Sequence, residues 1–342
     1  MNQKVKAGVI GLGRLGKEYS ILLQHHVKHI DLLAACSLNQ QELAFAKDKL
    51  GVQYTYTDHK QIVQNHDIDA IFIFSPPAHH AGQIIDSIEA GKHVFIATPL
   101  AINVEDCNKV IKSAKARPSQ VTMIGFEHRY DPAYIHAKEY IKKGRIGQPI
   151  LVESSTYEKE KTITYYQQYA SQASGIFMEL NIKNIDIIRW LTESEFDSVY
   201  SLGKTFKHDI FNQLRDAESA MSMLTMNDGC MANIQASRVA QDGFNLKTSI
   251  FGSEGSIEIL QNSPMESILI HDTNGRKVAL PQTYFERYRS ALQAQANDFV
   301  ECILESKKPR TNLLDGLEAT RTVVAMTKSF LMGDKISINR EG

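Results

Sequence analysis

The stretch VKAGVIGLGRLG, residues 5–16, decides the fold of the first part of this chain. Its apolar half, Val5–Ile10, predicts a buried β-strand. The glycines that follow, Gly11, Gly13 and Gly16, form a GxGxxG pattern, and the residues after them predict a helix. A strand, a glycine-rich turn and a helix in this order form the phosphate-binding fingerprint of dinucleotide-binding domains. The stretch therefore predicts a dinucleotide site near the start of the chain.

Each residue of this turn has its own expected role. Gly11 permits a tight turn, Gly13 lets a pyrophosphate approach the backbone, and Gly16 lets the helix pack closely on the strand. The helix N-terminus adds backbone N–H groups that bind phosphate. We include Arg14 and Leu15, which lie between the last two glycines, in the predicted cofactor site.

Apolar strand-like runs alternate with helical segments up to about residue 125, which predicts a parallel sheet with crossover helices. After the first strand and helix, strands are expected at 32–37, 70–74, 93–96 and 121–125, and helices at 40–50, 79–90 and 104–116. We therefore assign residues 1–125 to a Rossmann dinucleotide-binding domain of the α/β class.

The end of the second strand bears on the choice of cofactor. An acidic residue usually stands there and binds the adenosine ribose, but this chain has Ser37. Serine does not repel a 2′-phosphate, yet no arginine follows to bind one, and Asn39 could still bond a ribose hydroxyl. Both NAD and NADP stay open, and we expect weak discrimination between them.

The loop after the third long apolar strand reads Ser75-Pro76-Pro77, followed shortly by His80. Ligands of open parallel sheets lie beyond the carboxyl ends of the strands, so we expect this loop to face the dinucleotide. Its two prolines stiffen it. The alternative is a rigid turn without ligand contact.

From residue 126 to 342, alternating runs predict a second, α+β domain that binds substrate and forms oligomers. Asn227-Asp228-Gly229 is a hairpin turn between two of the runs. Short turns between strands favour a large, mainly antiparallel sheet. Such a sheet needs cover for its outer face, so we expect a homodimer or homotetramer through it. Strands are expected at 150–157, 198–206, 217–226, 230–238, 245–251, 256–260 and 267–271, and terminal helices at 288–305 and 315–330.

A helix is expected over residues 176–191. At 100° per residue, Glu179, Lys183 and Asp186 fall within about 60° of one another on an otherwise apolar surface. One interpretation is an ion pair between Glu179 and Lys183, four residues apart. The other is a polar stripe that faces a polyol.

Several of these motifs, in this order, resemble the glucose–fructose oxidoreductase, inositol dehydrogenase and MocA family, and the inositol 2-dehydrogenase-like branch in particular. The resemblance implies a Rossmann domain followed by a domain with a large open sheet. It also implies an NAD(P)-dependent oxidoreductase that moves hydride between a nicotinamide and a secondary alcohol of a cyclitol or sugar. The residues that carry it are 11–16, 75–80, 91–95, 125–132, 174–186, 284–288 and 315–316.

The chain departs from the family pattern where catalysis is expected. Family members usually carry Glu-Lys-Pro where this chain reads Ala97-Thr98-Pro99, so Thr98 replaces a lysine. Glu179 corresponds to the family's aspartate and Lys183 to its catalytic histidine, whereas Asp186 is retained. These departures leave an alternative function open, a catalytically silent dinucleotide- or sugar-binding protein with the family fold.

The resemblance assigns the remaining site residues. Lys183, Glu179 and Thr98 are the candidate catalytic residues, with Lys183 as the base. The substrate is expected to contact Tyr157 and Tyr288 as well as Glu179 and Lys183. The full cofactor set comprises Gly11, Gly13, Arg14, Leu15, Gly16, Ser37, Ser75, Pro76, Pro77, His80, Thr98, Pro99 and Arg129.

Composition excludes several other classes of function. A formal net charge of −1 gives no field to attract nucleic acid or an anionic membrane. No apolar run approaches the ~20 residues that span a bilayer. Four cysteines, with no CxxC pair, predict reduced thiols and no metal site. We expect a cytoplasmic protein without a signal peptide.

Overall fold

The computed structural model describes residues 3–161, 164, 166–167, 174–241, 243–259, 269–272, 275–278 and 283–339. The chain divides into two compact units. The first comprises Met1–Tyr130 and Ser290–Thr320, and the second comprises Asp131–Arg289 and Arg321–Gly342. The roles that we assign to residues 1–125 and 126–342 stay predictions.

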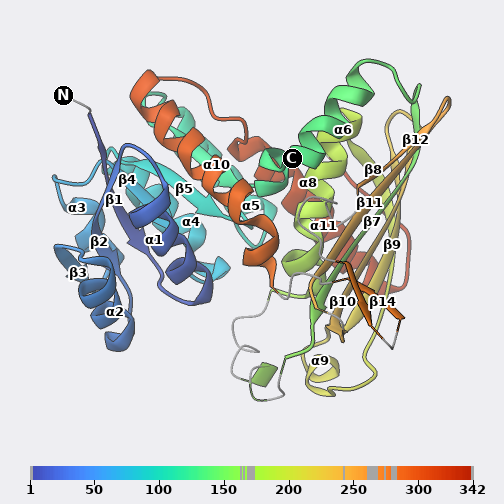
Figure 1. Ribbon diagram of the computed structural model, residues 1–342, viewed down its shortest axis with the longest axis horizontal. Helices are drawn as coiled ribbons and strands as arrows, with labels where there is room; N and C mark the ends of the chain where they lie inside the picture. The colour runs from blue at the N-terminus through green and yellow to red at the C-terminus, as the bar shows by residue number, and fades with distance from the viewer. Residues whose placement is uncertain are drawn as a thin grey trace. The chain divides into compact units, whose positions relative to one another are not determined.

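The first unit contains a six-stranded sheet in the order β3-β2-β1-β4-β5-β6 (Figure 1). Every pair of neighbouring strands is parallel, as expected of a Rossmann domain. The short strand β3 was not predicted, because three residues are too few for an apolar pattern. The strands are β1 Val5–Ile10, β2 Ile30–Cys36, β3 Tyr54–Tyr56, β4 Ala70–Ile73, β5 His93–Ala97 and β6 Thr122–Gly125.

Helices connect these strands and have clear local signals at their ends. Asn39 accepts a hydrogen bond from the Gln41 N–H and caps the second helix, which Gly51 ends in a left-handed conformation. The first helix ends at His26, because Val27 is extended. The helices are α1 Arg14–His26, α2 Gln40–Leu50, α3 His59–Gln64, α4 His80–Glu89 and α5 Val104–Lys115, with short turns η1 Pro77–His79 and η2 Glu127–Tyr130.

Two long helices late in the chain, α10 Tyr284–Glu305 and α11 Leu313–Met332, contribute residues to both units. Within the first unit, the α10 ring of Phe299 packs edge-on against Phe72 and Phe95, with centroids 5.2 and 5.8 Å apart. All three side chains are fully buried. This aromatic cluster shows why residues 290–320 belong to the core of the Rossmann unit.

The second unit contains a seven-stranded sheet in the order β12-β11-β7-β10-β9-β8-β15. Its pairs are antiparallel except β7–β10, which is parallel. The expected large, mainly antiparallel sheet is therefore confirmed. Its strands are β7 Pro149–Lys159, β8 Phe196–Lys204, β9 Ser219–Met226, β10 Met231–Ala240, β11 Asn245–Gly252, β12 Ser256–Ile259 and β15 Ile336–Ser337, and β13 Leu269–Asp272 pairs separately with β14 Gly275–Val278. The ends of two predicted strands, residue 260 and residues 267–268, lie outside the described residues.

One face of this sheet is packed against helices, which include α6 Pro132–Lys142 and α8 Ile182–Thr192 (Figure 1). Ser154 and Thr156 of β7 point to this face and bond the side chain of Asn184 on α8 at 2.7 and 2.9 Å. The alternate residues, Glu153 and Tyr157, lie on the opposite face and are more exposed. The short helices η4 Phe177–Asn181 and α9 Ile210–Gln213 complete the unit.

Candidate functional site

The glycine turn of the first unit leaves no room for side chains at two of its three glycines. Gly11 has φ +90°, and a Cβ there would lie 2.6 Å from the Ser75 amide nitrogen. A Cβ on Gly16 would lie 1.9 Å from the Gly11 carbonyl oxygen. Gly13 differs, because a Cβ on it would meet no protein atom within 4 Å. Packing therefore requires the first and last glycines, whereas the middle one borders open space.

This open space lies at the N-terminus of α1. Gly13 is the N-cap residue, and it has no side chain that could cap the helix. The first turn of α1 contains no acidic residue. Gly13 and Arg14 are exposed. Helix N-termini leave N–H groups without intrahelical partners and favour negative charge. The residues present fit a pyrophosphate, because the turn offers backbone N–H donors, open space and no negative charge. The binding of a pyrophosphate by this turn stays a prediction.

His80 joins the two loops that follow β4 and β5. One ring nitrogen lies 2.8 Å from the Ser75 carbonyl oxygen, and the other lies 2.7 Å from that of Pro99. The side chain is only 1% exposed, and burial lowers its pKa. A ring nitrogen bonds a carbonyl oxygen only while it carries a proton, so the neutral ring bonds one of the two carbonyls and the protonated ring bonds both, and these bonds oppose the effect of burial on the pKa. The Ser75 hydroxyl also donates to Gln83 at 2.5 Å.

Thr98 and Arg129, the other predicted cofactor contacts, differ in exposure. Thr98 follows β5 directly, is partly exposed and is joined to Pro99 by a cis peptide bond. Arg129 is buried, and its guanidinium donates to the Asp315 carboxylate at 2.9 Å within the same unit. The structure therefore shows an internal ion pair for Arg129.

Ser37, at the end of β2, has a partner that sequence reasoning missed. Its hydroxyl donates to the Glu42 carboxylate at 2.6 Å and accepts from the Asn39 N–H at 3.1 Å. Glu42 stands three residues after the N-cap Asn39, the spacing of a capping box. This spacing in the sequence is the local signal that would have predicted a hydrogen-bonding role for Glu42 at the start of the helix.

In the second unit, the expected regular helix over 176–191 begins with a π-helical turn, η4, before α8. A π turn holds more residues than an α turn, so the 100° spacing used for the polar stripe does not apply there. Glu179 lies inside this turn, and Lys183 lies in the first turn of α8. Both are partly exposed, whereas Asp186 is fully buried.

Glu179 is held by groups on both of its oxygens. Oε2 accepts from the Arg238 guanidinium at 2.8 Å, and Oε1 accepts from the Ser174 N–H at 2.9 Å. Arg238 also donates to Asp216 at 2.7 Å, and Asp216 in turn accepts from the Ile176 N–H at 2.9 Å. Burial raises the pKa of Glu179, and the charge of Arg238 opposes that rise. In the described chain, the ion pair of Glu179 is therefore with Arg238.

Lys183 has a second partner that sequence reasoning missed. Its amine donates a hydrogen bond of 2.7 Å to the hydroxyl of Tyr284 and lies 4.0 Å from the centroid of that ring. Tyr284 opens α10 and is partly exposed. It begins the Tyr-Phe-Glu-Arg-Tyr motif, of which only the last tyrosine was assigned to the site.

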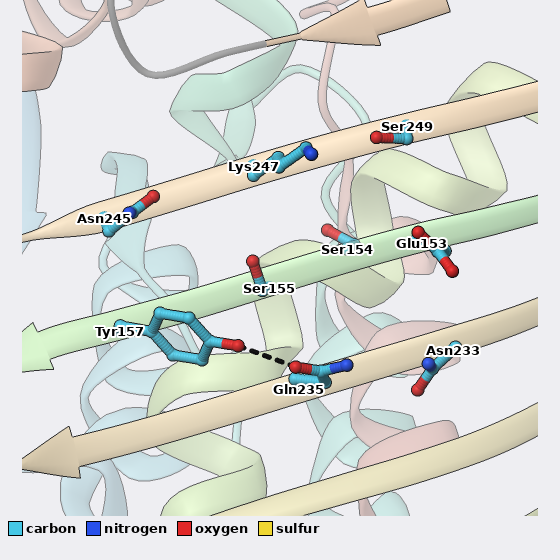
Figure 2. A pocket seen from close by; sticks show the side chains of 9 residues that line it. All are labelled: Glu153, Ser154, Ser155, Tyr157, Asn233, Gln235, Asn245, Lys247 and Ser249. Carbon is cyan, nitrogen blue, oxygen red and sulfur yellow. Dashed lines mark hydrogen bonds between the residues drawn. The ribbon is translucent and has the colours of Figure 1, made fainter. Parts of the chain in front are cut away.

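The two predicted substrate tyrosines lie in different places. Tyr288 packs beside Tyr284, with ring centroids 5.3 Å apart, and is fully buried, with the Arg287 guanidinium 4.6 Å from its ring centroid. Tyr157 lies on the sheet face opposite α8, where its hydroxyl donates to Gln235 at 2.6 Å (Figure 2). There it borders an open hollow of about 260 Å³ lined by Glu153, Ser154, Ser155, Tyr157, Asn233, Gln235, Asn245, Lys247 and Ser249.

Among the described residues, no group of three or more His, Cys, Asp or Glu side chains could hold a metal ion. No helix in this described part of the chain is long and apolar enough to span a membrane. The four cysteines are free thiols, and all are buried.

Comparison with known proteins agrees with this geometry. A family described as "Oxidoreductase family, NAD-binding Rossmann fold" matches residues 5–125, and the GFO/IDH/MocA C-terminal domain matches 134–258. The scyllo-inositol 2-dehydrogenase (NAD(+)) of Bacillus subtilis is 26% identical, over 99% of this chain and 98% of its own. An uncharacterized oxidoreductase of the same organism, YrbE, is 29% identical over the same shares.

Two crystal structures are similar over nearly their whole length. The scyllo-inositol dehydrogenase of Lactobacillus casei, with bound NAD(H) and scyllo-inositol, has a TM-score of 0.94 and 30% identity, covering 98% of this chain and 99% of its own. The myo-inositol 2-dehydrogenase of Lactobacillus plantarum has a TM-score of 0.95 and 29% identity, covering 98% and 100%. These matches confirm the resemblance seen in the sequence, the Rossmann domain and its binding of NAD. The chain belongs to the GFO/IDH/MocA family of oxidoreductases.

Proposed function

We propose that this protein moves hydride between NAD or NADP and a secondary alcohol of a cyclitol or sugar, as an inositol dehydrogenase-like enzyme. The observation that carries the proposal is the contact between Lys183 and Tyr284. It brings together an amine and a phenol, two groups able to exchange protons, at partly exposed positions, and the ion-paired Glu179 precedes Lys183 by four residues in the chain. Such a set suits an alcohol substrate, which must lose a hydroxyl proton.

On the cofactor side, the N–H groups at the start of α1 and the open space at Gly13 would hold the pyrophosphate. His80 would act as a positioning residue, because it ties the loops at Ser75 and Pro99 together. When bound, the nicotinamide ring supplies the acceptor for the hydride that leaves the alcohol carbon. Thr98 can hydrogen-bond a ligand, but its hydroxyl is not a base near neutral pH.

On the substrate side, Lys183 is our candidate for the base that receives the hydroxyl proton. In that role Lys183 has to start as the neutral amine, because an ammonium group has no lone pair with which to accept a proton. Tyr284 lies at 2.7 Å from the amine, so the phenol can take the proton of the substrate hydroxyl while its own proton passes to the Lys183 amine, which becomes the ammonium. Glu179 would add a fixed negative charge, since Arg238 and the Ser174 N–H hold its carboxylate.

We also propose that the protein is a cytoplasmic homodimer or homotetramer that associates through the outer face of the second sheet. That face carries exposed apolar side chains on neighbouring strands, the kind of surface that a second subunit covers. They are Leu202 on β8, Met221 and Met223 on β9, Met231 on β10 and Phe251 on β11. Sedimentation of the purified protein tests this part, and a monomer at micromolar concentration contradicts it.

The activity is tested with a panel of inositol isomers and aldose sugars, each with NAD and with NADP, by following the absorbance of the reduced cofactor. We expect turnover of at least one cyclitol. Calorimetric titration of NAD and NADP runs beside the panel. Dinucleotide binding without turnover of any substrate would favour the silent-binding alternative, for which the replacement of the family's lysine and histidine by Thr98 and Lys183 is the observation.

A further inference from the structure

The end of β2 carries a carboxylate that the sequence position alone does not reveal. Ser37 is the first residue after β2, and the Cys36 carbonyl before it accepts a hydrogen bond of 2.9 Å from the Gly11 N–H. Ser37 therefore lies beside the glycine turn. In dinucleotide-binding domains, this end of the second strand is where an acidic side chain binds the adenosine ribose.

Glu42 brings its carboxylate back to this strand end from the first turn of α2. Oε2 accepts the Ser37 hydroxyl at 2.6 Å, and Asn39 fixes the turn between them by capping the helix. Among the described residues, Oε1 of Glu42 has no hydrogen-bond partner. A carboxylate oxygen without a protein donor can accept a bond from a ligand hydroxyl.

The charges around this carboxylate are unfavourable for a second anion. Residues 37–46 contain no lysine or arginine. Burial, and after it the charge of Asp58, raises the pKa of the Cys36 thiol, the neighbour of Ser37 in the chain, to about 12. The Lys17 amine lies over α2, 5.5 Å from the centroid of the Phe45 ring. A 2′-phosphate bound at Ser37 would add negative charge beside the carboxylate of Glu42, and like charges at short range repel.

We propose that Glu42 is the residue that selects NAD over NADP in this protein. Glu42 supplies the carboxylate that an acidic residue at position 37 would supply in other dinucleotide-binding domains. Ser37 holds the Glu42 carboxylate in place through the 2.6 Å hydrogen bond. The inference rests on the proposed function, because it requires that the first unit binds a nicotinamide dinucleotide. A residue that only capped α2 would affect stability and leave the choice of cofactor unchanged.

The test is the ratio of the two dissociation constants, measured by calorimetry on wild type and on Glu42→Gln. Glutamine keeps a carbonyl acceptor for the Ser37 hydroxyl and removes the charge. We expect the wild type to bind NAD at least about tenfold more tightly than NADP, and the variant to lose about tenfold of that preference. Asp48→Asn is the matched control, since Asp48 is an exposed acid on the same helix and should leave the ratio unchanged.

The outcomes separate the two proposals. If wild type binds neither dinucleotide, the proposed function is overturned and this inference with it. If wild type prefers NADP, or if Glu42→Gln binds NAD with an unchanged ratio, the inference alone is overturned. Thermal unfolding of each variant shows whether α2 still folds. A lower melting temperature with an unchanged ratio identifies Glu42 as a capping residue only.

Discussion

The two units of this chain build their candidate functional groups in different ways. In the first unit, the candidate phosphate-binding groups are backbone N–H groups within the six consecutive residues Gly11–Gly16. In the second unit, they are side chains brought together from distant parts of the sequence. Glu179 and Arg238 are 59 residues apart, and Lys183 and Tyr284 are 101 residues apart.

This difference affects how each unit tolerates change. A backbone site needs only that glycine occupy the positions where a Cβ would clash, as at Gly11 and Gly16. A side-chain site needs each partner to be present, because a buried charge without its partner is costly. The GxGxxG pattern of the first unit is complete, whereas the second unit has a glutamate and a lysine where the resemblance to the family predicts aspartate and histidine.

Gly13→Val tests the backbone site and should have the largest effect on dinucleotide binding. The new side chain would occupy the open space beside the α1 N-terminus without clashing with the protein. We expect NAD to bind about 100-fold more weakly or worse, because hydrogen bonds to charged groups contribute about 1.5–3 kcal/mol each. Calorimetry measures the loss, Gly13→Ala should be intermediate, and unchanged melting temperatures confirm folding. Equal NAD affinity in Gly13→Val and wild type would remove the dinucleotide site from this turn.

Arg238→Met tests the side-chain site at its most buried member. Arg238 is 5% exposed and faces the carboxylates of Glu179 and Asp216. Removing one partner of a buried ion pair costs about 3–5 kcal/mol, so we expect a loss of that size in the free energy of unfolding near pH 7. Urea denaturation measures it. Arg145→Met, at an exposed arginine of the same unit, should stay within about 0.5 kcal/mol of wild type.

The same variant has a predictable pH dependence. Burial in the folded protein raises the pKa of Glu179 above its ordinary value, and the charge of Arg238 opposes this rise. A raised pKa means that folding is favoured while the group is protonated, and that stability is lost as pH rises through the folded pKa. Without Arg238 the pKa rises further, so the deficit of Arg238→Met should be smaller near pH 4 than near pH 7. A deficit that is the same at both values of pH would show that Glu179 is not its source.

Substitutions of Lys183 and Tyr284 should affect kcat, and that of Tyr284 has the smallest expected effect. Lys183→Met should lower kcat about 100-fold on any cyclitol that the wild type oxidises, as for a lost general base. Tyr284→Phe keeps the ring beside the amine and removes the hydroxyl, and we expect about a tenfold loss. If the two residues form one relay, the double variant should be little worse than Lys183→Met alone. Lys204→Met, at an exposed lysine of β8, is the control, and fully additive losses would contradict the relay.

The features predicted correctly from the sequence have local causes. The strand Val5–Ile10 and the helix Gln40–Leu50 have the predicted bounds, because their apolar patterns end at glycine or at an Asn cap. Local patterns were less informative elsewhere. The three residues of β3 are too few for a pattern, and nothing in the apolar spacing of 176–191 signals the π turn around Glu179.

Pairing between distant residues explains the differences at the candidate site. Tyr284 and Tyr288 lie one turn apart on α10, and both belong to the motif that resembles the family. Their order in the sequence does not say which one is fully buried and which one bonds Lys183. Tyr157 and Thr156 are adjacent, yet they lie on opposite faces of the sheet, and only Thr156 bonds a residue of α8.

The sequence by itself determined the family, the two kinds of sheet and the glycine turn. These features follow from short-range sterics and from periodic apolar patterns, and both can be recognised in the sequence. Only the tertiary structure decided that Glu42 returns to Ser37, that Arg238 holds Glu179 and that Tyr284 bonds Lys183. Each of these contacts depends on how a polar side chain is satisfied once folding has buried it, and that is set by whichever residues the fold brings within hydrogen-bonding distance.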